Sequence, residues 1–239
     1  MNNERPPITI VVTTYFPDGA EARIATALRT LASWREHLRY EGEIKIEICD
    51  DDSPEDMSLL FRRGLESDPP GYWREWRCSG STHLRAGVGS SLNSGIATCK
   101  ASGSLMLYAV DDWRIDAPFD LTPWADVLIE NSTVGCVRFF PHPHLRGGRI
   151  LNFRTGWAVE FERVGFYWAQ RPALYHMRFF DYYGGFPENV SALDVDEIYN
   201  ANICHAHPMS PKVILALPQA WTPDESDTVP LGHLVPERR

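Results

Sequence analysis

The chain has 239 residues, of which 44% are hydrophobic and 23% are charged, which is enough for a full core and argues against bulk disorder. The formal net charge of −9 argues against a general nucleic-acid coat or an anionic membrane surface as the partner. No apolar stretch approaches membrane-spanning length, and residues 1–7 lack the apolar core of a signal peptide. Five scattered cysteines without a Cys-x-x-Cys pair predict buried thiols in a reducing compartment, so we expect a cytoplasmic protein, either free or peripheral at a membrane.

The first half of the chain alternates strand and helix signals. Residues 8–13 are β-branched and predict a first strand, and strict alternation over residues 43–49 predicts a second. Apolar residues at helical spacing between residues 24 and 38, and again between 88 and 99, predict two helices. A capping serine, a proline and two acids at residues 53–56 predict the start of another helix. This alternation predicts a mostly parallel sheet with right-handed crossovers.

The next predicted strand is apolar from Ser104 to Val110 and ends in two adjacent carboxylates, Asp111 and Asp112. Ligands of open α/β sheets bind at the carboxyl ends of the strands. Two acids in apolar surroundings are costly unless a positive charge offsets them. The pair therefore favours a divalent cation that carries a phosphorylated ligand, with a solvent-exposed acidic loop as the alternative.

The second half of the chain is different. Between Val134 and Trp168 the signals are strand-like and aromatic, and a short helix is expected from Met177. A Gly184-Gly185 turn follows, and then a helix over residues 195–204. The tail after Pro218 is rich in proline and acids and predicts a strap or a disordered segment.

Three more polar clusters follow predicted strands or precede predicted helices. Thr13, Thr14 and Tyr15 suit a base and ribose, although such residues also commonly end a strand. Asp50 and Asp51 suit ribose hydroxyls or a base N–H, with acids that decorate a helix N-terminus as the alternative.

The third cluster combines Arg85 and Gly87 before a helix, where backbone N–H groups and a cation suit phosphate. Asn93 and Gly95 lie inside the same helical pattern. Both are poor helix formers, so something other than propensity holds them there.

In this order the clusters resemble glycosyltransferase family 2, the inverting enzymes of the GT-A fold. The matching motifs are Thr-Thr-Tyr at 13–15, Asp-Asp-Asp-Ser at 50–53, Arg-x-Gly at 85–87 with Asn-x-Gly at 93–95, Val-Asp-Asp at 110–112, Gly-Gly-Phe-Pro-Glu at 184–188, and Leu-Asp-Val-Asp at 193–196. The resemblance covers about residues 8 to 200. Asp52 replaces the family's glycine, Val110 its first Asp-x-Asp acid, and Leu193 the glutamate before its base.

The resemblance implies a role for each matched residue. Asp112 would bind Mn²⁺ or Mg²⁺, with Asp111 as a further ligand. Independently of the resemblance, His205 or His207 is a candidate to contact the diphosphate or its metal. Asp194 would be the general base, with Asp196 as the alternative. The residues that would bind the donor nucleotide are Thr13, Thr14, Tyr15, Asp50, Asp51, Arg85, Gly87, Asn93 and Asp111.

The implied fold is an α/β, Rossmann-like GT-A sheet flanked by helices, in a single domain over residues 1–220 with a tail at 221–239. Residues 8–114 would bind a UDP-, dTDP- or GDP-sugar, and residues 115–220 would bind the acceptor. The acceptor side holds seven arginines between Arg138 and Arg178. Aromatic residues interleave with them, which suits stacking on sugars or bases and binding of phosphate, with an aromatic core under a solvated arginine fringe as the alternative. The acceptor classes to consider are a glycan, a lipid-linked or phosphorylated carrier, a protein and a modified nucleobase.

Three alternatives stay open. Val110 and Leu193 allow a non-catalytic nucleotide-sugar binding module. A sugar-nucleotide pyrophosphorylase is disfavoured because no glycine-rich basic loop follows the first strand. Structural zinc is disfavoured because prolines flank both histidine pairs and no cysteine lies at finger spacing. Those pairs are His142 with His144 and His205 with His207.

Overall fold

The sheet is built around strand β1 (Ile8–Thr14), which is β-branched and almost wholly buried. It pairs in parallel with β3 (Ile44–Asp50) on one side and β4 (Leu105–Tyr108) on the other. The crossovers that parallel neighbours need run through α1 (Glu21–His37) and α3 (Gly87–Ser102). The predicted strand-helix alternation is thereby confirmed, and the carboxyl ends of the three strands meet at one edge of the sheet, called here the carboxyl edge.

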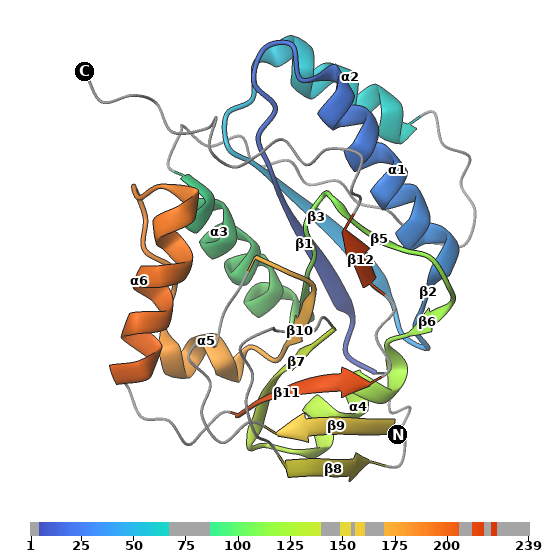
Figure 1. The fold of residues 1–239 in the computed structure, drawn as a ribbon, viewed down its shortest axis with the longest axis vertical. Coiled ribbons are helices and arrows are strands. Elements are labelled where there is room, and N and C mark those ends of the chain that lie inside the picture. Colours follow the sequence, from blue (N-terminus) through green and yellow to red (C-terminus); the bar gives the residue numbers. More distant parts are fainter. Residues whose placement is uncertain are drawn as a thin grey trace.

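The structure is a computed structural model. It describes residues 5–66, 87–139, 149–153, 156–160, 170–205, 212–217 and 221–223. The eight-stranded sheet has the order β3-β1-β4-β10-β7-β11-β9-β8 (Figure 1). By the pairing pattern, β10 (Ala173–Tyr175) and β9 (Gly156–Glu160) run opposite to the other six strands, so the sheet is mostly parallel, as predicted. The remaining strands are β7 (Val134–Arg138), β11 (Lys212–Leu217) and β8 (Arg149–Phe153).

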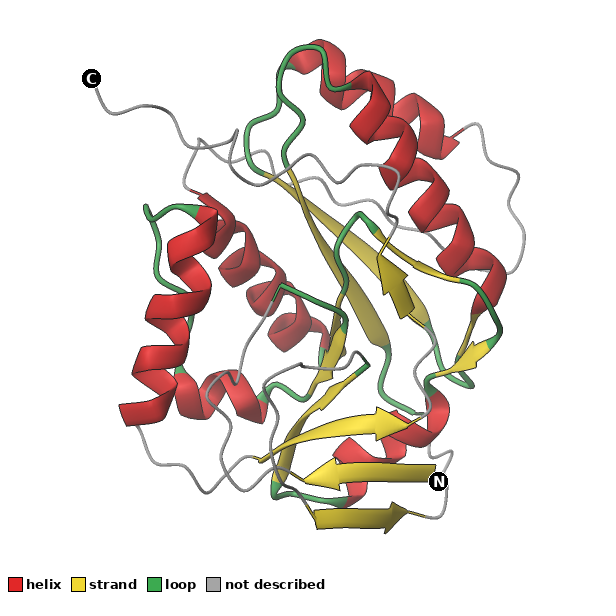
Figure 2. Cartoon of the chain, viewed as in Figure 1, coloured by secondary structure: helices red, strands yellow, loops and turns green. Residues whose placement is uncertain are grey.

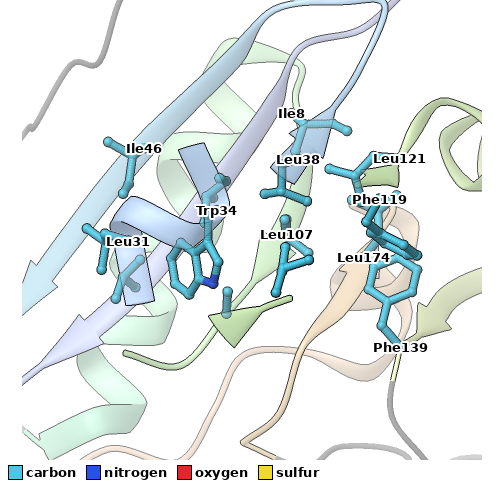
Figure 3. Packing of buried hydrophobic residues seen from close by; sticks show 14 of the residues in the cluster. Ile8, Leu31, Trp34, Leu38, Ile46, Leu107, Phe119, Leu121, Phe139 and Leu174 are labelled. Carbon is cyan, nitrogen blue, oxygen red and sulfur yellow. The ribbon is translucent and has the colours of Figure 1, made fainter. Parts of the chain in front are cut away.

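Helices pack on both faces of the sheet (Figures 1 and 2). Helix α1, α2 (Glu55–Glu66) and α4 (Thr122–Glu130) share one core cluster with the sheet. In that cluster Trp34 lies among leucine, isoleucine and phenylalanine side chains (Figure 3). Helix α3, α5 (Arg178–Tyr183) and α6 (Ala192–His205) form the second cluster. The result is a three-layer α/β fold with apolar contacts on both sides of β1, β4 and β10.

Two small ribbons complete the described part of the chain. Strand β2 (Leu38–Arg39) pairs with β6 (Phe119–Asp120), and β5 (Trp113–Ile115) pairs with β12 (Trp221–Pro223). Strand β12 lies at the start of the predicted tail, and residues 224–239 lie outside the described residues. Within the described helices, none is both long and apolar enough to cross a membrane.

The cysteines for which the structure gives side chains are buried free thiols, as the sequence predicts. They are Cys49, Cys99 and Cys136. The predicted turn at Gly184 is also confirmed, because this residue ends α5 with a φ of 83°.

Glycines let α3 approach its neighbours closely. A Cβ at Gly95 would overlap the Val11 side chain on β1, and a Cβ at Gly89 would overlap the carbonyl oxygen of Pro187.

We expect Gly89→Ala to lower the free energy of unfolding by about 2 kcal/mol in urea titrations, because a backbone oxygen cannot rotate out of the way as a side chain can. Ser90→Ala, on the same helix, adds no volume and should change stability by less than about 0.5 kcal/mol. Equal stability of wild type and Gly89→Ala would contradict this close packing.

Candidate functional site

The two carboxylates after β4 lie in different environments at the carboxyl edge. Asp111 is 4% exposed, whereas Asp112 is exposed. Burial raises the pKa of Asp111 to about 6; the Arg23 guanidinium opposes this shift, and the Asp112 charge adds to it. The Oδ2 atom of Asp111 is buried and has no hydrogen-bond partner, and it lies 3.6 Å from Nη2 of Arg23. Asp111 is therefore a buried acid with one oxygen held only by an ion pair.

Tyr108, the last residue of β4, is a phenol at the same edge whose pKa is affected by three carboxylates. Its side chain is fully buried, and its hydroxyl lies 3.5 Å from Oγ1 of Thr13. Burial raises the pKa of Tyr108, the Thr13 hydroxyl opposes the shift, and the charges of Asp196, Asp111 and Asp112 raise the pKa further. The fold thus brings an acid from α6 into the field of the same phenol as the acids after β4. Sequence analysis missed Tyr108 because its residue type fits an ordinary buried strand.

The two acids of α6, Asp194 and Asp196, differ in burial and in their hydrogen-bond partners. Asp194 is exposed at the helix N-terminus, where its carboxylate accepts a hydrogen bond from the Ser191 hydroxyl at 2.7 Å and its N–H donates to that hydroxyl at 3.2 Å. This is the geometry of a helix cap. Asp196 is partly buried, and its Oδ2 accepts a hydrogen bond from the backbone N–H of Gln170 at 3.3 Å. Of the two residues considered as the base, Asp196 is the one whose charge reaches Tyr108.

The carboxylate of Asp50 forms hydrogen bonds to neighbouring residues of the fold. It accepts hydrogen bonds from the Thr14 hydroxyl at 2.8 Å and from the Ser53 hydroxyl and N–H at 2.7 and 3.0 Å. The Ser58 hydroxyl adds a fourth bond at 3.3 Å. Ser53 in turn accepts the Phe16 N–H at 2.8 Å, so its hydroxyl links β1 and β3. Thr14 and Asp50 therefore hold the ends of two neighbouring strands together.

Asp51 joins the same edge to α3. Its Oδ1 accepts a hydrogen bond from the Gly87 N–H at 3.0 Å, and its own N–H donates to the Thr14 carbonyl at 2.8 Å. Asp52 has a φ of 64°, in the left-handed region that favours glycine and tolerates aspartate. This backbone conformation explains why Asp52 can occupy a position where the family that the chain resembles has glycine. Thr13 and Tyr15 are half-buried at this edge.

Asn93 faces a different neighbour. Its amide donates to the Phe186 carbonyl at 3.1 Å and to Oε1 of Glu188 at 2.8 Å, and its oxygen accepts the Phe186 N–H at 2.8 Å. A Cβ at Gly185 would press on the same oxygen. These contacts fasten the segment before α6 to α3 and account for Asn93 in the helix without a ligand, just as the approach to Val11 accounts for Gly95.

Several predicted site residues lie outside the described part. Arg85, His142, His144 and His207 are not among the described residues, and the side chain of His205 is not described. Among the side chains that the structure does describe, no group of three or more histidines, cysteines and acids lies close enough to hold a metal ion. Among the described residues, the candidate metal ligands at the end of β4 are therefore the two adjacent acids Asp111 and Asp112.

Comparison with known proteins rests on structure, since no family model and no curated protein matches the sequence. A mannosyltransferase from Pyrobaculum calidifontis, in complex with GDP-Man and Mn²⁺, matches with a TM-score of 0.54 and 18% identity over 89% of this chain. S. aureus TarS in complex with UDP-GlcNAc matches with a TM-score of 0.57 and 15% identity over 90% of this chain. The chain has the GT-A glycosyltransferase fold. It spans 57% of the length of each of these two chains. The predicted fold class is confirmed, and within this GT-A fold the acids described above lie at the carboxyl ends of β3 and β4 and on α6.

Proposed function

We propose that the chain is an inverting glycosyltransferase, which moves a sugar from a nucleotide-diphosphate donor to an acceptor hydroxyl. The observation that carries the proposal is the pair of adjacent acids, Asp111 and Asp112, just after β4 in a chain with the glycosyltransferase fold. The Asp196 charge, which raises the pKa of Tyr108 together with the charges of Asp111 and Asp112, supports a third acid from α6 at the same site. The complexes of the structural neighbours with GDP-Man and with UDP-GlcNAc support a nucleotide sugar as the donor.

A hard divalent cation fits the acids after β4. The Oδ2 atom of Asp111 is a buried oxygen without a hydrogen bond, and Asp112 follows it directly in the chain. Mn²⁺ and Mg²⁺ take oxygen ligands and often complete their shell with phosphate and water, so one or two carboxylates suffice. When bound, the cation would offset the charge on the departing diphosphate. We propose Asp111 as the principal ligand and Asp112, favoured from the sequence, as the second.

We propose Asp196 as the general base. As the acceptor oxygen attacks the anomeric carbon, its O–H bond breaks and the proton passes to the Asp196 carboxylate. A new C–O bond forms while the bond from the anomeric carbon to the diphosphate oxygen breaks, and this single displacement inverts the configuration. The N–H of Gln170, 3.3 Å from Oδ2, would hold the carboxylate in place. Asp194 would keep its role at the helix cap.

Thr13, Tyr15 and Asp51 would bind the nucleoside of a UDP-, dTDP- or GDP-sugar. Thr14 and Asp50 would position the carboxyl edge of the sheet, because their side chains are joined by a hydrogen bond. The arginine-rich second half stays our proposal for the acceptor side, with a glycan, a lipid-linked or phosphorylated carrier, a protein or a modified nucleobase as the acceptor. A single catalytic domain over residues 1–220 and a cytoplasmic location are part of the same proposal.

The test is a thermal-shift panel of UDP, dTDP, GDP and CDP, each with Mn²⁺ and with EDTA. We expect one of them to raise Tm by about 5–10 °C at about 100 times its Kd, and to lose much of the effect in EDTA. No shift with any nucleotide in the presence of Mn²⁺ would overturn the donor site. A shift of equal size with and without EDTA would overturn the metal.

A further inference from the structure

Arg23 holds the buried acid of the site. Its Nη2 lies 3.6 Å from Oδ2 of Asp111, the oxygen that no hydrogen bond satisfies. The two side chains differ in burial, with 45% of Arg23 and 5% of Asp111 exposed. A buried carboxylate is costly unless a cation faces it. Arg23 therefore stabilises Asp111 from the solvent side of the edge.

The position of Arg23 has no explanation in helix α1 itself. It is the third residue of the helix, whose first turn favours acids and disfavours cations because of the helix dipole. The Arg23 Cζ atom lies 5.9 Å from the ring centroid of Phe16, which is fully buried and packs against Phe61. The ring supports the guanidinium by a cation–π contact. Arg23 is thus positioned toward Asp111 while nearly half of its side chain is exposed to solvent.

A divalent cation at Asp111 would need the same oxygen. Two cations in contact with one carboxylate oxygen repel each other, and the repulsion is strong where water is largely excluded. Val110 provides no second acid that could bind the ion while Arg23 keeps its place. We propose that Arg23 is an exchangeable counter-ion of Asp111, which neutralises the acid when no divalent cation is bound and competes with the cation for Oδ2.

The inference rests on the proposed function in the choice of Asp111 as cation ligand, and its test uses Mn²⁺ alone with the full chain. Binding is measured by the loss of the electron paramagnetic resonance signal of free Mn²⁺, at constant pH and ionic strength. We expect Arg23→Gln to bind Mn²⁺ about 5–10-fold more tightly than wild type, which corresponds to about 1–1.4 kcal/mol. Arg23→Lys keeps the charge and should stay within about twofold of wild type.

Arg29→Gln is the matched control. Arg29 is on the same helix, is exposed, and donates a hydrogen bond to the Thr26 hydroxyl at 2.8 Å, so its loss removes the same charge without touching Asp111. It should change Mn²⁺ affinity by less than about twofold. In the double variant with Asp111→Asn, the affinity gained by Arg23→Gln should disappear.

Mn²⁺ affinity of Arg23→Gln equal to or weaker than that of wild type would overturn the competition. So would the absence of Mn²⁺ binding in wild type and variant alike, or a gain that survives Asp111→Asn. The glycosyltransferase proposal fails separately, because a nucleotide panel without any shift would refute it even if Arg23→Gln tightened Mn²⁺ binding.

Discussion

Asp196→Asn should abolish glycosyl transfer and leave donor binding intact. The variant keeps the size of the side chain and an oxygen for the Gln170 N–H, but it cannot take a proton. General-base catalysis contributes about 10²–10⁴-fold, so we expect kcat to fall by about 10³-fold while the donor Kd changes by less than about threefold. The measurements are release of nucleoside diphosphate from the nucleotide sugar and titration calorimetry with that sugar.

The same change two residues earlier is the control. Asp194→Asn alters an exposed residue that is bonded to Ser191, and it should retain activity within a few-fold. Loss of catalysis in Asp194→Asn together with a fully active Asp196→Asn would reverse the assignment of the base. Loss of donor binding in Asp196→Asn would show that this acid binds the donor instead.

Asp111→Asn should make the protein more stable at neutral pH and remove its metal-dependent donor binding. The pKa of Asp111 is raised to about 6, mainly by burial, against about 3.9 for an aspartate in an unfolded chain. Above pH 6 the folded state carries a buried charge at a cost on the order of 2–3 kcal/mol, and asparagine avoids it. The gain in the free energy of unfolding should shrink as pH falls from about 6 to 4, where wild-type Asp111 becomes protonated.

Urea titrations at about pH 8, 6 and 4 measure this difference. Asp112→Asn, which changes an exposed acid, should alter stability little at any of these pH values. Mn²⁺-dependent stabilisation by the nucleoside diphosphate should be lost in Asp111→Asn and only weakened in Asp112→Asn. An Asp111→Asn protein that is less stable than wild type at pH 8, or that keeps the metal-dependent shift, would contradict the account of this acid.

The parts of the fold that sequence predicts well are those set by local periodicity. Strands β1 and β3 and helices α1 and α3 follow from β-branched runs, strict alternation and helical spacing, because each element buries one face. Helix α4 and strand β11 were missed, although Pro123 and the apolar run over residues 213–217 are the signals that could have revealed them. The carboxyl edge followed from the parallel topology, since strands in one direction end together.

The choice between the acids of α6 shows what local sequence leaves open. Asp194 and Asp196 differ by about 200° around a helix, so only one can face the sheet. The buried residues Val195 and Tyr199 mark the inward face, and Asp196 lies about 80° from its centre against about 120° for Asp194. That signal is in the sequence, but it needs the buried face of α6 to be known.

In a sequence, polar residues that stabilise the fold cannot be told apart by type from polar residues that bind a ligand. Asn93 and Asp50 are the types that hold a nucleotide, yet their side chains bond the segment before α6 and the end of β1. Arg23 is the reverse case, because a cation in the first turn of a helix is unfavourable there and marks a contact elsewhere. Which residues belong to which class depends on contacts between elements far apart in the chain.

Glycosyl transfer with inversion is tested most directly by proton NMR of the reaction. Purified protein is incubated with UDP-, dTDP- and GDP-sugars, with Mn²⁺ or EDTA, and the anomeric signals of the first product are followed. We predict that one donor releases its nucleoside diphosphate with Mn²⁺ and gives a sugar product of opposite anomeric configuration. Retained configuration, or donor binding without any release, would contradict the claim, and the second result would favour a non-catalytic binding module.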